Sequence, residues 1–249
     1  MHENLIEKIK QKREFSGLPD SIVERAANVS NYSVKETRAL LRKYFGVFLT
    51  NKILKGRGEE VLTKHVSSKN RDYKRLYNKI SENFSNFKSV VDLGCGVNGL
   101  SYLQIYYLLG ISEYYGVEAS KQIVDLVNGY FDNMKANDKL NCIWLDLFEI
   151  GKVKEIIKNA SGPKMIFMFQ VVDALEGIEK NFSKKFFLEI SKILDGEDKV
   201  ALSFSLGSIG GRKRFVANRK WLVSFLDENF IIEKDFEMFG ERFIVFGKK

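Results

Sequence analysis

A short apolar stretch that runs directly into a glycine-rich turn is the part of the sequence whose residues most clearly suggest chemistry. Residues 90–99 read Val-Val-Asp-Leu-Gly-Cys-Gly-Val-Asn-Gly. Glycines after a strand let a ligand approach the backbone where a side chain would collide. In open α/β sheets, ligands bind beyond the carboxyl ends of the strands. The turn from Gly94 to Gly96 is therefore a candidate ligand-binding turn, although many tight strand-to-helix connections also contain Gly-x-Gly.

Two acidic residues follow at the ends of the next two predicted strands. Glu118 ends the strand-like segment 114–118, and Asp146 ends the segment 142–146. A carboxylate about twenty residues after the glycines can accept hydrogen bonds from both hydroxyls of a ribose. An acid one strand further along can bind the amino group of an adenine. Together these positions predict a site for a ligand that contains adenosine.

The acid before the glycines separates two cofactors of this kind. The string from Gly94 to Gly99 satisfies the Gly-x-Gly-x-x-Gly pattern of nicotinamide dinucleotide sites. Asp92, however, would repel a pyrophosphate and favours a cationic ligand. S-Adenosylmethionine carries a sulfonium and an ammonium group and no phosphate. We therefore predict S-adenosylmethionine as the cofactor and S-adenosylhomocysteine as its product; a turn-capping carboxylate is the alternative role for Asp92.

Four neighbours of these positions complete the predicted cofactor site, namely Cys95, Ala119, Leu147 and Gln170. Cys95 has no partner in the sequence that would make it a nucleophile, so we expect it to pack. Gln170 lies at a strand end, where it is placed to hydrogen-bond the cofactor, to position the substrate or to bond to the backbone.

The elements that would hold these residues alternate along the second part of the chain. Strands are predicted at 89–93, 114–118, 142–146, 165–172, 199–204, 230–238 and 243–246, and helices at 120–134, 153–159, 183–194 and 220–228. Strands that alternate with helices form a parallel sheet covered on both faces. The last two strands, separated by Gly240, are expected to pair antiparallel. The predicted fold class is α/β, with a Rossmann-like, mostly parallel sheet and a terminal antiparallel strand.

The first part of the chain differs in charge and pattern. Residues 1–88 contain 19 Lys and Arg against 10 Asp and Glu, whereas the remaining residues are nearly neutral. Helices are predicted here, with capping boxes at Ser21–Glu24 and Ser33–Glu36. A basic module beside a neutral one favours a polyanion-binding appendage, and a solvated Lys-rich surface is the alternative. We predict a basic helical domain over 1–86 and a cofactor-binding domain over 87–249.

Composition excludes several other classes of protein. The chain has 249 residues and is 45% hydrophobic, which is too apolar for a disordered protein. Its 2 Cys and 2 His do not suit a disulfide scaffold or a structural zinc site, so no metal is expected. No apolar run reaches about 18 residues and the N-terminus is charged, so we expect neither a membrane span nor a secretory signal. The expected location is the cytoplasm.

Two further strings resemble one narrow family. Residues 65–71 read His-Val-Ser-Ser-Lys-Asn-Arg, and residues 203–212 read Ser-Phe-Ser-Leu-Gly-Ser-Ile-Gly-Gly-Arg. They are similar to the strings His-x-Ser-Thr-Arg-Glu-Arg and Ser-Phe-Pro-x-x-Ser-Leu-Gly-Gly-Arg of the aminoglycoside-resistance 16S rRNA methyltransferases. These are class I methyltransferases that modify N7 of guanine-1405 in the decoding site of the 30S subunit. The resemblance spans almost the whole chain and departs from the family at Ser68, Lys69, Asn70, Gly99 and Ser205, as in a divergent member.

The resemblance implies roles for further residues. Arg71 would pair with the carboxylate of the methionyl part of the cofactor, a geometry that suits a guanidinium group. Arg212 would grip the RNA or position the target, and His65 is expected to be structural. The basic domain of a monomeric enzyme would dock on 16S rRNA within the 30S subunit. Its candidate RNA-binding residues are Lys8, Lys10, Lys12, Arg13, Arg38, Arg42, Lys43, Lys52, Lys55, Arg57, Lys74, Arg75 and Arg212.

No side chain is expected to act as a general base, because guanine N7 carries a lone pair and no proton. Gln170 and Arg212 are the candidates for positioning the substrate. Three other functions stay open at this stage. They are methylation of another RNA site such as a nearby adenine N1, methylation of a small molecule, and a non-catalytic role as an rRNA-binding factor.

Overall fold

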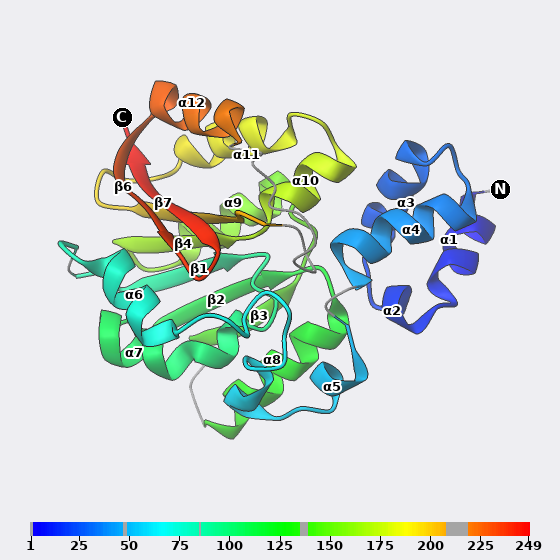
Figure 1. Ribbon diagram of the computed structural model, residues 1–249, viewed down its shortest axis with the longest axis horizontal. Helices are drawn as coiled ribbons and strands as arrows, with labels where there is room; N and C mark the ends of the chain where they lie inside the picture. Colours follow the sequence, from blue (N-terminus) through cyan, green and yellow to red (C-terminus); the bar gives the residue numbers. More distant parts are fainter. Residues whose placement is uncertain (1, 47–48, 85, 135–138, 208–218) are drawn as a thin grey trace.

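A single seven-stranded sheet organises the structure, a computed structural model that describes residues 2–46, 49–84, 86–134, 139–207 and 219–249. The strand order is β3-β2-β1-β4-β5-β7-β6 (Figure 1). The strands are β1 (Ser89–Leu93), β2 (Glu113–Glu118), β3 (Leu140–Trp144), β4 (Lys164–Phe169), β5 (Lys199–Ser205), β6 (Phe230–Met238) and β7 (Glu241–Lys248).

Strands β1 to β5 pair parallel, and β7 runs antiparallel between β5 and β6. This confirms the predicted α/β class and the antiparallel pairing at the end of the chain. The chain moves outward from β1 to β2 and β3, then returns to the other side of β1 with β4. Such a reversal of strand order opens a crevice at the carboxyl ends of the strands.

Each inner strand supplies both faces of the sheet with apolar side chains. Along β1, Val91 and Leu93 enter one hydrophobic core and Val90 enters the other. In β4, Ile166 and Phe167 are divided in the same way, as the two-residue period of a strand requires. The sheet is therefore buried on both sides, which explains why its strands are continuously apolar.

Helices cover the two faces. The first core includes residues of α9 (Ile150–Asn159), α10 (Val172–Ile178), α11 (Phe182–Ser191) and α12 (Lys220–Asn229). The second includes residues of α5 (Asn51–Leu54), η2 (Gly58–Val61), α6 (Tyr73–Ser81), α7 (Tyr102–Leu109) and α8 (Lys121–Asn133). A 3₁₀ turn, η3 (Asn98–Ser101), links the glycine turn to α7.

The first four helices form a lobe at the right of Figure 1, and their buried apolar residues belong to the first core. They are α1 (His2–Lys10), α2 (Arg13–Ser16), α3 (Asp20–Val29) and α4 (Val34–Tyr44). We call residues 2–46 the N-terminal lobe. In contrast, α5, η2 and α6 pack along the second face of the sheet, although they also belong to the predicted basic domain. The division at residue 86 stays a prediction.

The structure confirms one of the two predicted helix caps and contradicts the other. Ser33 caps α4 as predicted, with its hydroxyl oxygen 3.4 Å from the backbone N–H of Glu36. The capping box at Ser21 is wrong, because α3 begins at Asp20 with Pro19 in the capping position. A proline at that point fixes the backbone dihedral and starts the helix one residue before Ser21. The Ser21 hydroxyl is therefore free to bond elsewhere.

Two strand ends also differ from the predicted ones. The apolar segment predicted as a strand to residue 172 ends as β4 at Phe169, and α10 follows from Val172. Strand β3 ends at Trp144, so Asp146 lies in the turn beyond the strand rather than at its last residue. None of the helices in the described ranges has the length and hydropathy needed to cross a bilayer.

Candidate active site

A cleft lies at the carboxyl ends of β1, β2 and β4, where the strand order reverses. The space within it, its open mouth included, is about 980 Å³. Nine of the ten predicted cofactor residues line it, namely Arg71, Gly94, Cys95, Gly96, Glu118, Ala119, Asp146, Leu147 and Gln170. The structure thus brings together residues from five separate segments of the sequence.

The glycine turn forms the floor of the cleft. Gly94 and Gly96 have φ values of +72° and +50°, in the left-handed region that favours glycine. The N–H groups of Gly94 and Cys95 donate to the carbonyl of Val117 at 2.8 and 3.0 Å and tie the turn to β2. A Cβ at Gly94 would lie 2.4 Å from Cγ2 of Val171, which also lines the cleft. Glycine is therefore needed there for both conformation and space.

Glu118 ends β2 and bridges the glycine turn to the start of α8. Its Oε2 accepts the Gly96 N–H at 3.0 Å, and its Oε1 accepts the Ser120 N–H at 2.8 Å. Burial raises the pKa of Glu118, while these backbone hydrogen bonds oppose the rise. Each carboxylate oxygen has two lone pairs, so both can accept a further bond from a ligand. The predicted ribose-binding position is thus held rigidly at the edge of the cleft.

Asp146 is held in a similar way, but one of its partners comes from the N-terminal lobe. Its Oδ1 accepts the N–H of Phe148 at 2.8 Å, and its Oδ2 accepts the Ser21 hydroxyl at 2.7 Å. Burial raises the pKa of Asp146, and the two hydrogen bonds oppose the rise. The contact with Ser21 could not be predicted, because the two residues lie 125 positions apart.

Asp92 is the one predicted cofactor residue that does not line the cleft. It is 1% exposed and lies in β1, where its Oδ2 accepts Asn98 Nδ2 at 2.6 Å and the Tyr114 hydroxyl at 2.7 Å. Its Oδ1 has no hydrogen-bond partner among the described residues. Burial raises its pKa from 3.8 to about 6. From this position, Asp92 would act on a cationic ligand in the cleft through its charge. A direct contact between Asp92 and the cofactor stays a prediction.

The buried charge of Asp92 leads to a prediction about stability. Because its pKa rises from 3.8 to about 6 on folding, the folded state holds this proton more tightly than the unfolded chain does. The ionised carboxylate therefore destabilises the fold above pH 6, and the penalty fades as pH falls toward 4. Asp92→Asn is expected to be more stable than wild type in urea unfolding at pH 7.5 and equal to it near pH 4. Wild type being the more stable at pH 7.5 would contradict this.

Arg71 lines the cleft and is committed to an acidic partner. Its Nε and Nη2 both donate at 2.8 Å to the two carboxylate oxygens of Glu241, at the start of β7. Its guanidinium carbon also lies 5.2 Å from the centre of the Phe169 ring. Two of the five N–H donors are used by Glu241, which leaves donors for a ligand carboxylate. Pairing with the cofactor stays a prediction.

His65 and Cys95 occupy buried positions at the cleft. The Nδ1 of His65 lies 3.2 Å from the hydroxyl of Ser68, and burial together with the nearby Arg71 lowers its pKa to about 4. His65 is therefore neutral near pH 7, in keeping with the expected structural role. The sulfur of Cys95 lies 3.5 Å from that of Cys142, and this contact together with burial raises the pKa of Cys95 well above its ordinary range.

Gln170 has an unusual backbone for its residue type. Its φ is +59°, and its N–H donates to the Ser203 carbonyl at 2.9 Å. A non-glycine residue in the left-handed region costs of order 1–3 kcal/mol, and such strain is common where a side chain must be aimed at a ligand. This bond satisfies the backbone N–H of Gln170. Its side-chain amide therefore remains available to a ligand in the cleft, which Gln170 lines.

Sequence reasoning missed the apolar walls of the cleft. They include Ile22, Tyr44, Phe45 and Leu49 before the sheet, and Ile123, Phe148 and Phe169 within the α/β part. Phe148 and Phe169 adjoin predicted site residues, so their positions in the sequence offered a signal. Ile22 and Phe45 look like ordinary core residues of amphipathic helices, and nothing local marks them as cleft residues.

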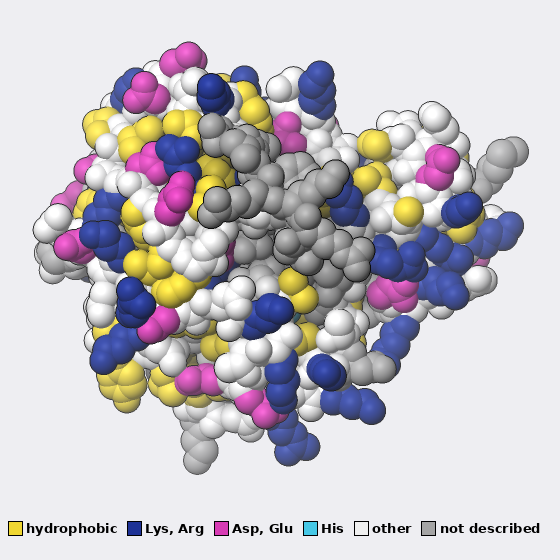
Figure 2. Space-filling model, in the orientation of Figure 1, with side chains coloured by type: hydrophobic (Ala, Val, Ile, Leu, Met, Phe, Trp, Pro, Cys, Tyr) yellow, Lys and Arg dark blue, Asp and Glu magenta, His cyan; other side chains and the backbone are white. Residues whose placement is uncertain are grey.

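The candidate RNA-binding residues lie mainly on the surface. Ten of the thirteen are exposed, whereas Lys10 and Arg38 are partly buried and Arg212 lies outside the described residues. Figure 2 shows Lys and Arg side chains gathered on the lower side of the N-terminal lobe and below α5. Some of this charge is neutralised locally, as in the ion pair between Arg42 and Glu14 at 2.7 Å. In the described part of the chain, no group of His, Cys, Asp and Glu could hold a metal ion.

Comparison by sequence gives no relative: the chain matches no protein-family model and none of the curated proteins. Comparison by structure gives matches along the whole chain. The 16S rRNA methylase RmtB superposes with a TM-score of 0.76 at 17% identity, covering 100% of this chain and 99% of that one. An rRNA methylase from Escherichia coli gives 0.78 at 16% identity, with 100% of both chains covered.

The chain has the fold of these rRNA methylases. A third match, the 16S rRNA methyltransferase RmtF in complex with S-adenosyl-L-homocysteine, gives a TM-score of 0.75 at 15% identity. It covers 100% of this chain and 98% of that one, so the N-terminal helices are included in the shared rRNA methylase fold.

Proposed function

We propose that the protein is an S-adenosylmethionine-dependent methyltransferase that methylates 16S rRNA in the 30S subunit. The proposed target is N7 of guanine-1405 in the decoding site, and the expected consequence is resistance to aminoglycosides. One observation carries this proposal. A cleft lined by Gly94, Gly96, Glu118 and Asp146 lies at the switch point of a sheet whose fold, basic N-terminal helices included, matches 16S rRNA methylases over the whole chain.

The residues present fit S-adenosylmethionine. Gly94 and Gly96 leave the floor of the cleft open, and Glu118 has acceptor capacity for the ribose hydroxyls. Asp146 would accept the adenine amino group, between the apolar side chains of Ile123 and Phe148. Arg71 would hold the carboxylate at the far end, with Cys95, Ala119 and Leu147 as walls. When bound, this cofactor supplies an electrophilic methyl group on a sulfonium.

The chain's own contribution to the reaction is positioning. Guanine N7 attacks through an in-plane lone pair and has no proton to lose, so no general base is required. Alignment of two reactants in one rigid site can supply a large part of the rate enhancement. Gln170 borders the cleft at the end of β4 and would orient the guanine, which must first leave its stack at a cost of a few kcal/mol. Arg212, in the segment that follows β5, would also help to position the guanine.

Docking on RNA would be the task of the basic N-terminal residues. Lys8, Lys12 and Lys55 are exposed and stand outside the ion pairs described for this part of the chain. We expect the triple change Lys8→Glu, Lys12→Glu and Lys55→Glu to weaken 30S binding tenfold or more at moderate salt. The affinity of the variant is also expected to depend less steeply on salt concentration. Each phosphate contact releases counterions, and the variant would make fewer such contacts. S-Adenosylhomocysteine affinity should stay within a factor of two.

A variant of equal net charge serves as the control for that experiment. Lys158, Lys180 and Lys185 are exposed lysines of the α/β part, and their reversal changes the net charge by the same amount. Filter binding to 30S subunits is expected to separate the two triple variants. Equal loss in both would indicate a general charge effect and remove the assignment to the N-terminal residues.

The proposed function is tested by methyl transfer from S-[methyl-³H]adenosylmethionine to purified ribosomal particles. We expect label in the 16S rRNA of 30S subunits and none in 50S subunits. Label in small molecules alone would favour a small-molecule methyltransferase. Binding to 30S without any transfer, while the cofactor binds normally, would favour a non-catalytic rRNA-binding factor.

A further inference from the structure

A second wall of the cofactor cleft comes from the N-terminal lobe. Ile22 of α3 and Tyr44 and Phe45 at the end of α4 line the cleft opposite residues of the sheet edge. The guanidinium carbon of Arg25, one helical turn after Ile22, lies 4.9 Å from the centre of the Phe148 ring, and Phe148 itself lines the cleft. The lobe that holds seven of the thirteen candidate RNA-binding residues is therefore also part of the cleft.

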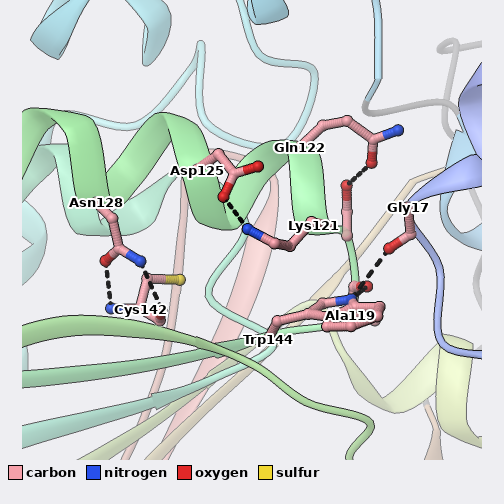
Figure 3. Close-up of polar contacts among 9 residues, drawn as sticks. Gly17, Ala119, Lys121, Gln122, Asp125, Asn128, Cys142 and Trp144 are labelled. Carbon is pink, nitrogen blue, oxygen red and sulfur yellow. Dashed lines mark hydrogen bonds and ion pairs between the residues drawn. The ribbon is translucent and has the colours of Figure 1, made fainter.

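A polar seam attaches this lobe to the edge of the sheet (Figure 3). The carbonyl of Gly17, between α2 and α3, accepts the backbone N–H of Lys121 at 3.0 Å and the indole N–H of Trp144 at 3.0 Å. The same indole N–H is shared with the carbonyl of Ala119 at 2.8 Å. Gln122 adds a side-chain bond to the carbonyl of Arg13 at 3.1 Å. Lys121 and Gln122 lie at the start of α8, which follows β2, and Trp144 is the last residue of β3, so the seam runs along the strand ends that form the cleft.

Ser21 makes the most direct link between lobe and site. Its hydroxyl donates to Oδ2 of Asp146 at 2.7 Å, while the Phe148 N–H donates to Oδ1 at 2.8 Å. The lobe thus orients one oxygen of the carboxylate and the turn after β3 orients the other. Each oxygen keeps a lone pair for a ligand, in a direction that these two donors set.

We propose that Ser21 is a positioning residue of the cofactor site, and that the N-terminal lobe couples cofactor binding to RNA binding. The coupling rests on the proposed function. A ligand that fills the cleft would contact both walls and would strengthen the attachment of the lobe, which already shares the first core with the sheet. A firmly attached lobe would hold its basic residues in one arrangement. The conformational entropy lost when RNA binds would then be smaller. Because linkage is reciprocal, RNA on the lobe tightens cofactor binding by the same factor.

The charged groups around Asp146 set the sign of a further effect. Burial and Glu149 favour the protonated acid, whereas the Phe148 N–H, the Ser21 hydroxyl and Arg25 favour the ionised carboxylate. Loss of the Ser21 hydroxyl therefore raises the pKa of Asp146 further. Cofactor binding in Ser21→Ala should then decline at a higher pH than in wild type as the solution is acidified. A side chain with only a packing role would not move that pH profile.

The first test measures S-adenosylhomocysteine binding by calorimetry between pH 5 and pH 8. We expect Ser21→Ala to bind three- to tenfold more weakly than wild type at pH 7.5, with the acid limb moved to higher pH. Ser21→Thr, which keeps the hydroxyl, should restore both properties. Ser191→Ala, which removes a half-buried hydroxyl on α11 that donates only to the carbonyl of Leu188 among the described residues, is the matched control and should behave as wild type. Unchanged affinity and pH profile in Ser21→Ala would overturn the positioning role.

The second test measures the coupling itself. Trp144 reports on the seam once Trp221, the other tryptophan of the chain, is changed to Phe. We expect S-adenosylhomocysteine to change Trp144 emission and to tighten 30S binding at least fivefold in the Trp221→Phe protein. With Ser21→Ala added, the tightening should fall below twofold. Equal 30S affinity with and without S-adenosylhomocysteine would overturn the coupling, whereas failure of either ligand to bind alone would contradict the proposed function instead.

Discussion

Glu118→Ala is expected to weaken S-adenosylhomocysteine binding by about 10- to 150-fold, because a hydrogen bond to a charged group contributes about 1.5–3 kcal/mol. The carboxylate serves two purposes at the end of β2. It accepts the N–H groups of Gly96 and Ser120, and it offers its remaining lone pairs to the cleft. Removing it deprives the ligand of an acceptor and also releases the glycine turn. Calorimetry with the full-length protein measures the loss.

Glu113 provides a control on the same strand. It is the first residue of β2, so it lies at the end of the strand that is remote from the cleft. Its carboxylate forms an ion pair with Lys139 at 2.8 Å. Glu113→Ala removes the same side chain and is expected to change S-adenosylhomocysteine affinity less than twofold. Similar affinities for Glu118→Ala and wild type would contradict the placement of the cofactor in this cleft.

Gly94→Ala is expected to lower the melting temperature by roughly 5–15 °C. Two costs add at this position. The left-handed conformation, with φ of +72°, costs an L-residue roughly 1–2 kcal/mol, and the new Cβ would lie 2.4 Å from Cγ2 of Val171. Overpacking of this kind costs about 1–3 kcal/mol, and a chain of this size loses about 2–4 °C per kcal/mol. Methyl transfer should fall with the distortion of the turn, measured at a temperature where the variant is folded.

Gly110→Ala is a control that measures the conformational cost of such a change without the steric cost that Gly94→Ala also carries. The φ of Gly110 is +65° and a Cβ there would meet nothing within 4 Å, so Gly110→Ala carries the conformational cost alone. The expected drop in melting temperature is about 2–6 °C. Adding Val171→Ala to Gly94→Ala should recover part of the loss, since it removes the colliding methyl groups. An equal drop for Gly94→Ala and Gly110→Ala, without recovery in the double variant, would show that contact with Val171 does not matter.

The sequence predicted those residues of the cleft that local rules bring together; their contacts with a cofactor stay predictions. The glycine turn and Glu118 follow from the strand-to-turn pattern, because the carboxyl ends of parallel strands meet at one edge of a sheet. Asp146 was predicted for the same reason, although the structure places it two residues beyond β3. Ser33 was identified as a helix cap because capping depends on neighbours only three residues away.

The parts that the sequence could not predict depend on distant residues. Ser21 has the spacing of a capping residue, but Pro19 starts the helix earlier and the hydroxyl bonds to Asp146 instead. The ion pair of Arg71 with Glu241 joins residues 170 positions apart. The apolar run after residue 165 concealed the end of β4, because the left-handed turn at Gln170 is rare for its residue type.

The methylated nucleotide can be located by cleavage of the 16S rRNA at the modified base. 30S subunits incubated with the protein and S-adenosylmethionine would be reduced and treated with aniline, which breaks the chain at N7-methylguanine. Primer extension along the 16S rRNA would then locate the break. We expect one enzyme-dependent stop, at guanine-1405, that disappears in the Glu118→Ala variant. A stop at another nucleotide, or methylation without an aniline-sensitive guanine, would contradict the proposed target while leaving the cofactor site in place.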